Sequence, residues 1–162
     1  MNPSLATDFM ASTIDPVCDW AEVKTIPGTH QQGLFSRKNY ARGVMLGRFT
    51  AAARFLEPNR LTIQTGPQEH IHLLPEALSF TNHSCDPTIY FNMQLFEIEA
   101  LQNIRIGDEL TFFYPSTEWE MAEPFSCCCG SPRCLGKIQG ARHLLPEKIP
   151  AYRLNDFIKH LL

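Results

Sequence analysis

Four cysteines crowd into eight consecutive positions near the end of this chain, within the stretch SCCCGSPRCLG that runs from Ser126 to Gly136. Three of them, Cys127, Cys129 and Cys134, have the spacing of metal ligands, and the glycine after the second permits a tight turn. Thiolates at this density favour zinc, which takes four sulfur or nitrogen ligands in a tetrahedron. A fold built around such a site must bring a fourth ligand to this segment.

The fourth ligand has to come from elsewhere in the chain, and five side chains are candidates: Cys128, Cys85, Cys18, His83 and His143. Cys128 stands between two ligands, so in an extended chain its side chain points away from them. Cys85 is favoured because it lies in a second distinctive stretch, NHSC, and would clip the C-terminal segment to the body. Buried thiols without a metal, and a catalytic zinc with an open position, are the alternatives.

Composition limits the setting of these cysteines. At 162 residues, with 44% hydrophobic and 19% charged residues, the chain suits one globular domain with a substantial core. It has no apolar run near the ~20 residues of a membrane span, and its start does not resemble a secretory signal. We therefore expect an intracellular protein, cytoplasmic or nuclear, with reduced thiols and no membrane partner. The formal charge of −3 does not support direct nucleic-acid binding and permits a basic peptide substrate.

Short strands separated by turns predict a mostly β fold with short helices. Runs of β-branched and aromatic residues predict strands at 21–26, at two places within 34–53, at 60–66 and 70–74, at two places within 88–104, and at 108–114. Of these, 60–66 and 70–74 form an expected hairpin. At the end of the chain Leu154, Phe157, Ile158, Leu161 and Leu162 recur at helical spacing. This stripe predicts a helix of about 12 residues that packs on the body.

Four distinctive stretches follow one another along the chain: QGLFSRKNYARGVMLGRF at 32–49, NHSCDP at 82–87, GDELTFFY at 107–114 and CCCGSPRCLG at 127–136. In these stretches the chain resembles the SET-domain family of protein-lysine methyltransferases. The last stretch matches the cysteine and glycine positions of the family's post-SET zinc segment. The resemblance implies the SET-domain fold, in which small curved β-sheets surround a knot-like core, followed by the post-SET zinc segment and a terminal helix.

The resemblance also implies how the chain is divided. We expect an N-terminal arm at 1–21, the SET domain at 22–122, the post-SET zinc segment at 123–140 and a C-terminal helical extension at 141–162. The cysteine-rich pre-SET segment of some members has no counterpart, because residues 1–30 contain only Cys18.

The family's cofactor and ligands follow from the matching positions. S-adenosylmethionine is the implied methyl donor, with the zinc segment closing over its adenine side. The implied donor-binding residues are Gly33, Leu34, Phe35, Asn82 and His83. One structural zinc ion is implied, and its ligands are Cys85, Cys127, Cys129 and Cys134.

Catalysis is implied at Tyr114, where the donor pocket meets a narrow channel for the substrate amine. A lysine has to lose its proton before it can attack, and a nearby sulfonium and an apolar channel both lower its pKa from about 10.4. Phe112 matches the channel position that controls the number of methyl groups, and a phenylalanine there leaves room for two or three. Gln31 departs from the family, which usually has a glycine at that place.

Three functions follow from this resemblance. The first is methylation of a lysine in a protein or peptide, with a histone as one candidate partner. The second is reuse of the fold for small-molecule chemistry, either methylation or cyclisation in a biosynthetic pathway. The third is a zinc-stabilised binding module without catalysis, which Gln31 favours if its side chain blocks the donor.

Overall fold

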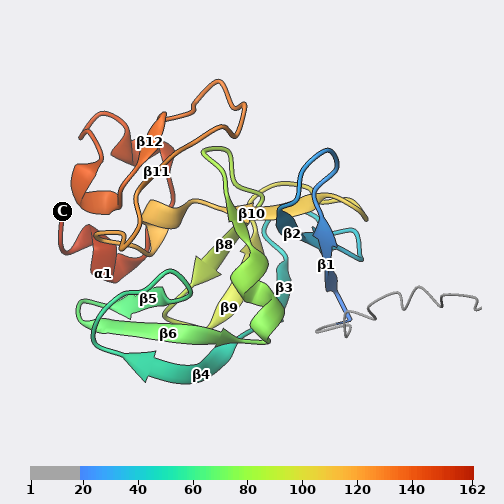
Figure 1. Cartoon of the computed structure of the whole chain (residues 1–162), viewed down its shortest axis with the longest axis horizontal. Helices are drawn as coiled ribbons and strands as arrows, with labels where there is room; N and C mark the ends of the chain where they lie inside the picture. Colours follow the sequence, from blue (N-terminus) through green and yellow to red (C-terminus); the bar gives the residue numbers. More distant parts are fainter. Residues whose placement is uncertain (1–18) are drawn as a thin grey trace, which may run out of the picture.

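The structure is a computed structural model that describes residues 19–162, so Cys18 and residues 1–18 of the predicted arm lie outside the described residues. The described chain consists mainly of short strands joined by turns (Figure 1). In chain order the strands are β1 (Ala21–Thr25), β2 (Gln32–Ser36), β3 (Met45–Arg48), β4 (Thr50–Phe55), β5 (Ile63–Gly66), β6 (Glu69–Leu74), β7 (Asn82–His83), β8 (Ile89–Asn92), β9 (Glu97–Ala100), β10 (Glu109–Phe112), β11 (Phe125–Ser126) and β12 (Lys137–Ile138). This confirms the prediction of a mostly β fold.

The described residues contain five helices, all of them short. Four are 3₁₀ helices and one is an α-helix: η1 (Glu76–Phe80), η2 (Tyr114–Ser116), η3 (Ala141–His143), η4 (Ile149–Ala151) and α1 (Asp156–Lys159). The described part of the chain has no helix with the length and hydropathy that crossing a membrane requires.

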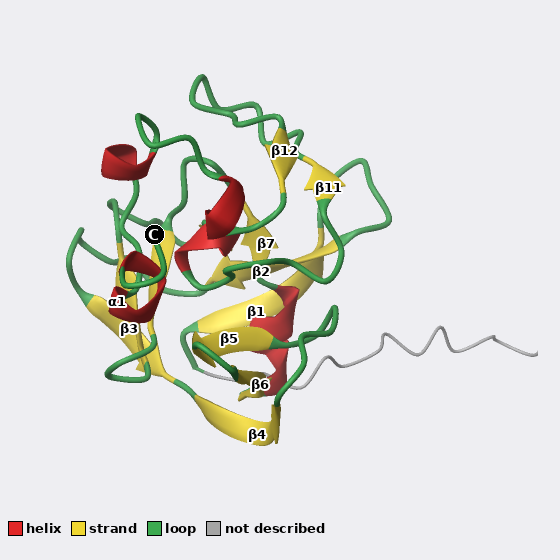
Figure 2. Cartoon of the chain, turned by 90° about the vertical axis from the view of Figure 1, so that its left-hand side faces the viewer, coloured by secondary structure: helices red, strands yellow, loops and turns green. Residues whose placement is uncertain are grey.

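The strands form four small sheets, ordered β1-β2-β10-β7, β3-β9-β8, β4-β6-β5 and β11-β12. The predicted hairpin is confirmed, since β5 and β6 pair antiparallel with Ile63 opposite Ile71. Figures 1 and 2 both show the β11–β12 pair at the opposite end of the molecule from β4. The main core lies between the sheets and contains the fully buried side chains of Leu34, Phe91 and Leu110.

The central contact of the fold joins two stretches that are far apart in sequence. Strand β7 pairs in parallel with β10, with Asn82 opposite Thr111 and His83 opposite Phe112. Just beyond β7, Thr88 reinforces the same pairing, because its backbone N–H donates to Thr111 O at 3.0 Å. Its hydroxyl in turn accepts from Thr111 N at 2.8 Å. These bonds bring the NHSC stretch against the strand that ends at Tyr114.

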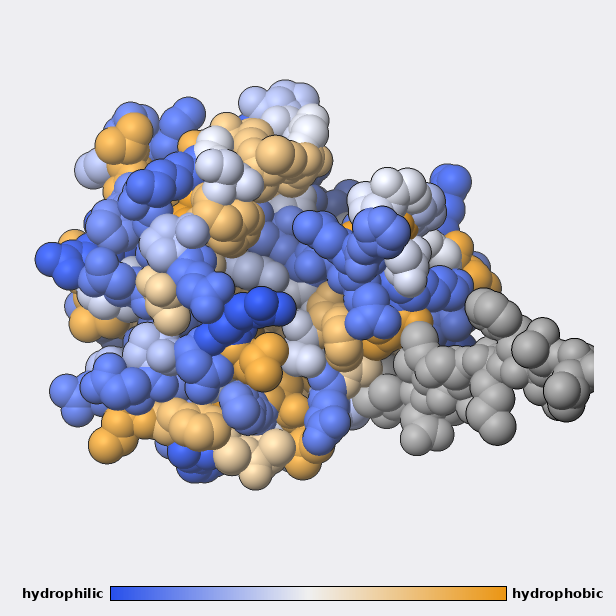
Figure 3. Space-filling model, viewed as in Figure 1, coloured by the Kyte–Doolittle hydropathy of each residue, from blue (hydrophilic) through white to orange (hydrophobic). Residues whose placement is uncertain are grey.

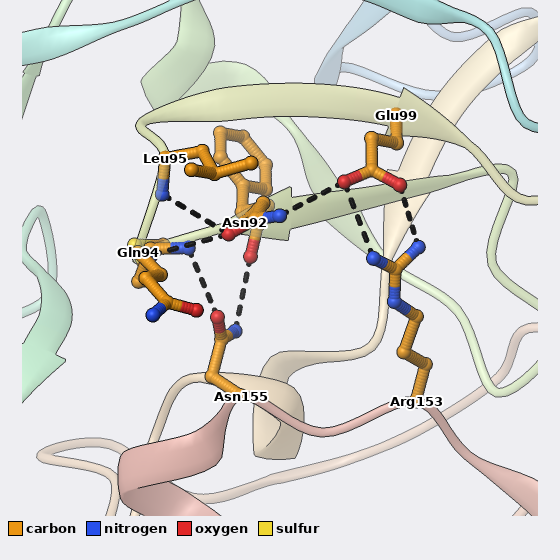
Figure 4. A network of polar contacts seen from close by, with 8 residues as sticks. Asn92, Gln94, Leu95, Glu99, Arg153 and Asn155 are labelled. Carbon is orange, nitrogen blue, oxygen red and sulfur yellow. Dashed lines mark hydrogen bonds and ion pairs between the residues drawn. The ribbon is translucent and has the colours of Figure 1, made fainter.

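The C-terminal extension docks through Asn155, whose side chain is buried (Figure 4). Its Nδ2 donates to the carbonyls of Phe91 and Ser116, each at 3.0 Å. Its Oδ1 accepts from Met93 N at 2.9 Å. One amide therefore joins the extension to strand β8, to the turn after it and to the segment that follows Tyr114.

The predicted C-terminal helix is wrong in length, because α1 has four residues, Asp156–Lys159. The apolar stripe is correct over its first part, since Leu154 and Ile158 are buried in a second cluster with Phe113 and Ala141. The stripe fails at the end, where Leu161 and Leu162 are 37% and 50% exposed. A single turn suffices here, because the buried contacts and Asn155 hold the segment rather than helix propensity.

Apolar side chains also reach the surface around the β4–β6–β5 sheet. Hydrophobic surface lies along the lower edge of the face shown in Figure 3, where Figure 1 places β4. Leu56 and Leu61, which follow β4 and precede β5, are 79% and 58% exposed. Single exposed leucines of this kind are ordinary on globular proteins.

We predict that Asn155→Ala lowers the free energy of unfolding by about 3 kcal/mol, because buried backbone groups on separate segments lose their side-chain partner. Urea unfolding followed by circular dichroism measures the change. The control is Asn103→Ala, which removes one exposed acceptor for Arg42 N and should cost about 1 kcal/mol or less. Equal losses in the two variants would contradict the role given to Asn155.

Candidate active site and metal centre

The four predicted zinc ligands come together in the structure. The sulfur atoms of Cys85, Cys127, Cys129 and Cys134 all lie within 4.8 Å of one another. Cys128 is exposed and is not part of this group. Four sulfurs at such separations suit a tetrahedral ion with Zn–S bonds of about 2.3 Å. The cluster therefore has the ligand number and chemistry of a structural zinc site.

Backbone hydrogen bonds shape the loop that carries three of these cysteines. Strands β11 and β12 pair antiparallel, and Cys127 N donates to Gly136 O at 2.7 Å. Gly130 and Gly136 have φ angles of +71° and +76°, a region that side chains disfavour. The backbone N–H of Leu135 points at Cys85 Sγ, 3.4 Å away. The glycines of the motif thus serve the turns that wrap the sulfurs around one point.

The crowded sulfurs have very different affinities for protons. Burial raises the pKa of the Cys85 thiol to about 11. Burial acts in the same direction on Cys129, but hydrogen bonds from the backbone of Cys85 and Ser131 lower its pKa to about 6. Four thiols in one place cannot all ionise without a cation, so the arrangement favours a metal ion among them.

Gly33 lies where two polar side chains approach the backbone of β2. A Cβ at this position would lie 2.7 Å from Glu109 Oε1 and 3.1 Å from Asn82 Nδ2, so glycine leaves the necessary room. Asn82 Nδ2 donates to Glu109 Oε1 at 2.9 Å and to Gln32 O at 3.0 Å. Both N–H bonds of Asn82 are therefore used, and the described residues give its Oδ1 no hydrogen bond.

The neighbouring positions differ in what they expose. Leu34 is fully buried in the main core, and its strand pairs on both sides, with Val23 of β1 and Leu110 of β10 opposite it. The Phe35 ring lies under the Lys24 ammonium, 6.0 Å from ring centroid to nitrogen. Gln31 is exposed, and its carbonyl accepts from Ile26 N at 2.8 Å to close the turn before β2.

His83 lies between the cysteine cluster and Tyr114. Its Nδ1 accepts from the backbone N–H of Tyr114 at 3.2 Å, so this nitrogen carries no proton. Burial lowers the pKa of His83 to about 4, which keeps the ring neutral. The ring hydrogen therefore resides on Nε2, which lies 3.3 Å from Cys85 Sγ. His83 thus links a cysteine of the cluster to the backbone of the tyrosine.

Tyr114 begins η2, directly after strand β10, and is surrounded by aromatic rings. Its ring centroid lies 4.7 Å from Phe112, 5.2 Å from His83 and 5.9 Å from Phe125. Its hydroxyl donates to Thr81 O at 3.1 Å. Burial, and then the nearby negative charges of Glu118 and Glu109, raise the pKa of Tyr114 to about 12, so the hydroxyl stays protonated.

Two acidic residues of this region were missed by the sequence reasoning. Glu109 lies inside the GDELTFFY stretch and accepts a hydrogen bond from Asn82. Its carboxylate lies so close to β2 that only glycine fits at position 33. Glu118 follows Tyr114 by four positions and is buried. An acid in a polar stretch such as STEWE reads as a surface residue, and only its packing reveals that it is enclosed.

A cavity of about 420 Å³ lies next to the NHSC stretch and the residue before Tyr114. Its lining includes Asp86 and Pro87 after the NHSC stretch, Phe113 before the tyrosine, and Arg133 and Tyr152 from the C-terminal part of the chain. None of the residues predicted to bind the donor lines this cavity. The predicted donor site and this cavity are therefore separate features.

Known proteins resemble this chain in sequence. The SET domain family matches residues 31–115, which are 85 of the 162 residues. Methyltransferase flvH of Aspergillus flavus is 41% identical over 122 residues, or 74% of this chain and 68% of that protein. Histone-lysine N-methyltransferases described as H3 lysine-36 specific, from Aspergillus oryzae and Emericella nidulans, are 37% identical over 67 residues. Those 67 residues are 38% of this chain and 7% of either enzyme.

Solved structures resemble the chain in fold. KRYPTONITE in complex with mCHH DNA, an H3(1–15) peptide and SAH has a TM-score of 0.54 and 20% sequence identity. KRYPTONITE with mCHG DNA and SAH has a TM-score of 0.56 and 18% identity. Each match covers 72% of this chain and less than a third of the KRYPTONITE chain, 29% and 28%. The family match over more than half of the chain and the extended similarity to flvH together lead to one conclusion: this chain belongs to the SET-domain family of methyltransferases.

Proposed function

We propose that this protein transfers a methyl group from S-adenosylmethionine to an amine nitrogen, with the lysine side chain of a protein, such as a histone, as the first candidate acceptor. The observation that carries the proposal is the junction of β7 with β10, at which His83 Nδ1 accepts from Tyr114 N. That junction sets the candidate donor-binding residues against the candidate catalytic tyrosine. The H3 lysine-36 enzymes among the relatives support lysine as the acceptor.

Asn82, His83 and Gly33–Phe35 are the proposed donor site. Because Glu109 and Gln32 use both N–H bonds of Asn82, the amide presents Oδ1 as an acceptor. An acceptor of this kind suits the ammonium group of the donor's methionine part. Leu34 is fully buried, so its proposed contribution is to support the strand that carries Gly33 and Phe35. Gln31 is exposed on the turn before that strand, which favours a contact at the edge of the site over a block.

S-adenosylmethionine, when bound, supplies an electrophilic methyl group on a sulfonium. Tyr114 is the proposed catalytic residue, and its hydroxyl stays protonated and directed at Thr81 O, so its oxygen lone pairs can orient the amine. Phe112 and Phe125 pack against the tyrosine ring and exclude water from its surroundings. Alignment of the amine with the methyl carbon supplies most of the rate.

Zinc held by Cys85, Cys127, Cys129 and Cys134 is the proposed structural ion. The Nε2–H of His83 and the N–H of Leu135 both face Cys85 Sγ, and such donors stabilise a metal-bound thiolate. The proposed zinc segment is 123–140, between a SET domain at 22–122 and an extension at 141–162. An intracellular location, cytoplasmic or nuclear, is part of the proposal, because free thiols persist in reducing compartments.

A small amine is the second candidate acceptor. Its support is the similarity to flvH, which is called only a methyltransferase and matches a larger share of both chains than the histone enzymes do. Tritium-labelled S-adenosylmethionine, offered with histones, a cell lysate and a panel of simple amines, separates the two acceptors. Label in none of them would contradict methyl transfer.

We predict that Tyr114→Phe lowers the methyl-transfer rate by about 100-fold or more, because the amine loses the group that orients it. Calorimetry should give the same S-adenosylmethionine affinity for the variant as for the wild type. Tyr40→Phe is the control and should keep full activity. A rate unchanged in Tyr114→Phe would rule out the catalytic role.

Gly33→Ala should weaken S-adenosylmethionine binding by about tenfold, since the new Cβ would lie 2.7 Å from Glu109 Oε1 and disturb Asn82. Calorimetric titration of the wild type and the variant measures this. Gly66→Ala provides the matched glycine control, since Gly66 has no positive φ and its added Cβ would meet only Glu69 Cβ, at an ordinary contact distance of 3.9 Å. If the wild type does not bind the donor, the protein is a binding module instead.

Purified protein should contain one equivalent of zinc, and Cys134→Ser should lose it together with several degrees of melting temperature. Elemental analysis and thermal denaturation measure both quantities. Cys128→Ser should keep the zinc, because Cys128 is exposed and outside the cluster. Zinc retained in Cys134→Ser, or lost in Cys128→Ser, would contradict the assigned ligands.

A further inference from the structure

Glu118 is a buried acid without a cationic partner. Its exposed fraction is 8%, and no lysine, arginine or histidine of residues 19–162 forms an ion pair with it. Glutamate is almost never buried unless it is paired, because an isolated carboxylate loses its hydration. The acids of the described chain that do form ion pairs all keep at least 18% of their side-chain surface exposed. Within the described residues, Glu118 is thus a largely buried acid that no cationic side chain neutralises.

Hydrogen bonds fix one oxygen of this carboxylate and leave the other unused. Oε1 accepts from Gln64 N at 2.8 Å and from the Thr117 hydroxyl at 3.4 Å. A second hydrogen bond joins the same two segments, since the side-chain Oε1 of Gln64 accepts from Trp119 N at 2.8 Å. For Oε2, the described residues provide no hydrogen bond. The group is therefore held rigidly with one oxygen free to accept.

Glu118 lies one turn of chain after the proposed catalytic tyrosine. The backbone N–H of Glu118 donates to Tyr114 O at 2.9 Å, so the two residues share one turn of chain. After burial, the charge of Glu118 is the largest cause of the raised pKa of Tyr114. Burial raises the pKa of Glu118 itself to about 7, so near neutral pH it can take up a proton.

We propose that Glu118 is the counter-ion of the substrate's ammonium group, so that the site selects acceptors that arrive as cationic amines. This inference rests on the proposed function and names its substrate class. A proton passes from the ammonium nitrogen to a Glu118 carboxylate oxygen. The freed lone pair then forms the N–C bond to the methyl group while the C–S bond breaks, and its electron pair stays on sulfur. The products are a methylated ammonium and a neutral thioether.

The experiment compares two ligands of one length that differ in charge. The protein is first saturated with S-adenosylhomocysteine, and the binding of n-butylammonium and of 1-butanol is then measured by ligand-observed NMR titration. The wild type should bind n-butylammonium at least about tenfold more tightly than 1-butanol, which corresponds to one desolvated ion pair. Glu118→Gln should abolish that ratio by weakening n-butylammonium alone, since Gln keeps an acceptor for Gln64 N.

Glu123→Gln is the matched control, because Glu123 is exposed in the same segment and its variant should bind both ligands as the wild type does. Glu118→Asp should recover part of the ratio, since it restores the charge. A structural role alone predicts a lower melting temperature in Glu118→Gln with an unchanged ratio, and that result would overturn the proposal. Wild-type protein that binds S-adenosylhomocysteine but does not prefer n-butylammonium would overturn it too, and would leave the donor site standing.

Discussion

The parallel pairing of β7 with β10 is the contact on which the remaining features depend. Only two residue pairs take part, Asn82 with Thr111 and His83 with Phe112. Through them the Asn82 amide meets Glu109, the His83 ring meets Tyr114, and Cys85 is carried to the far cysteines. So short a ladder contributes little free energy by itself, and the hydrogen bonds of Thr88 to Thr111 extend it.

Burial gives this small region its chemistry. His83 stays neutral, Tyr114 stays protonated and Glu118 takes up protons near neutral pH, all because desolvation disfavours their charged forms. The tertiary packing therefore sets the protonation state of each of these three side chains.

The strands, the hairpin and the cysteine group were accessible from the sequence, because alternation, turn residues and ligand spacing are local signals. Cys85 was also accessible, since its stretch stood out. The terminal helix was not, because Leu161 and Leu162 repeat the apolar spacing without having a surface to bury against. Glu118 was not accessible either, since burial of an acid depends on segments such as β5 that come from elsewhere in the chain.

Asn155 has a consequence for how this protein can vary. Because one amide bonds to Phe91, Met93 and Ser116, the residues after the cysteine cluster hold strand β8 against the segment that follows Tyr114. The predicted extension at 141–162 is therefore not a separate folding unit, because Asn155 hydrogen-bonds it to the body of the domain. The last residues should unfold together with the β8 strand as one cooperative unit. Insertions are consequently better tolerated in the exposed turn at Asn59–Leu61 than between Gly140 and Asn155.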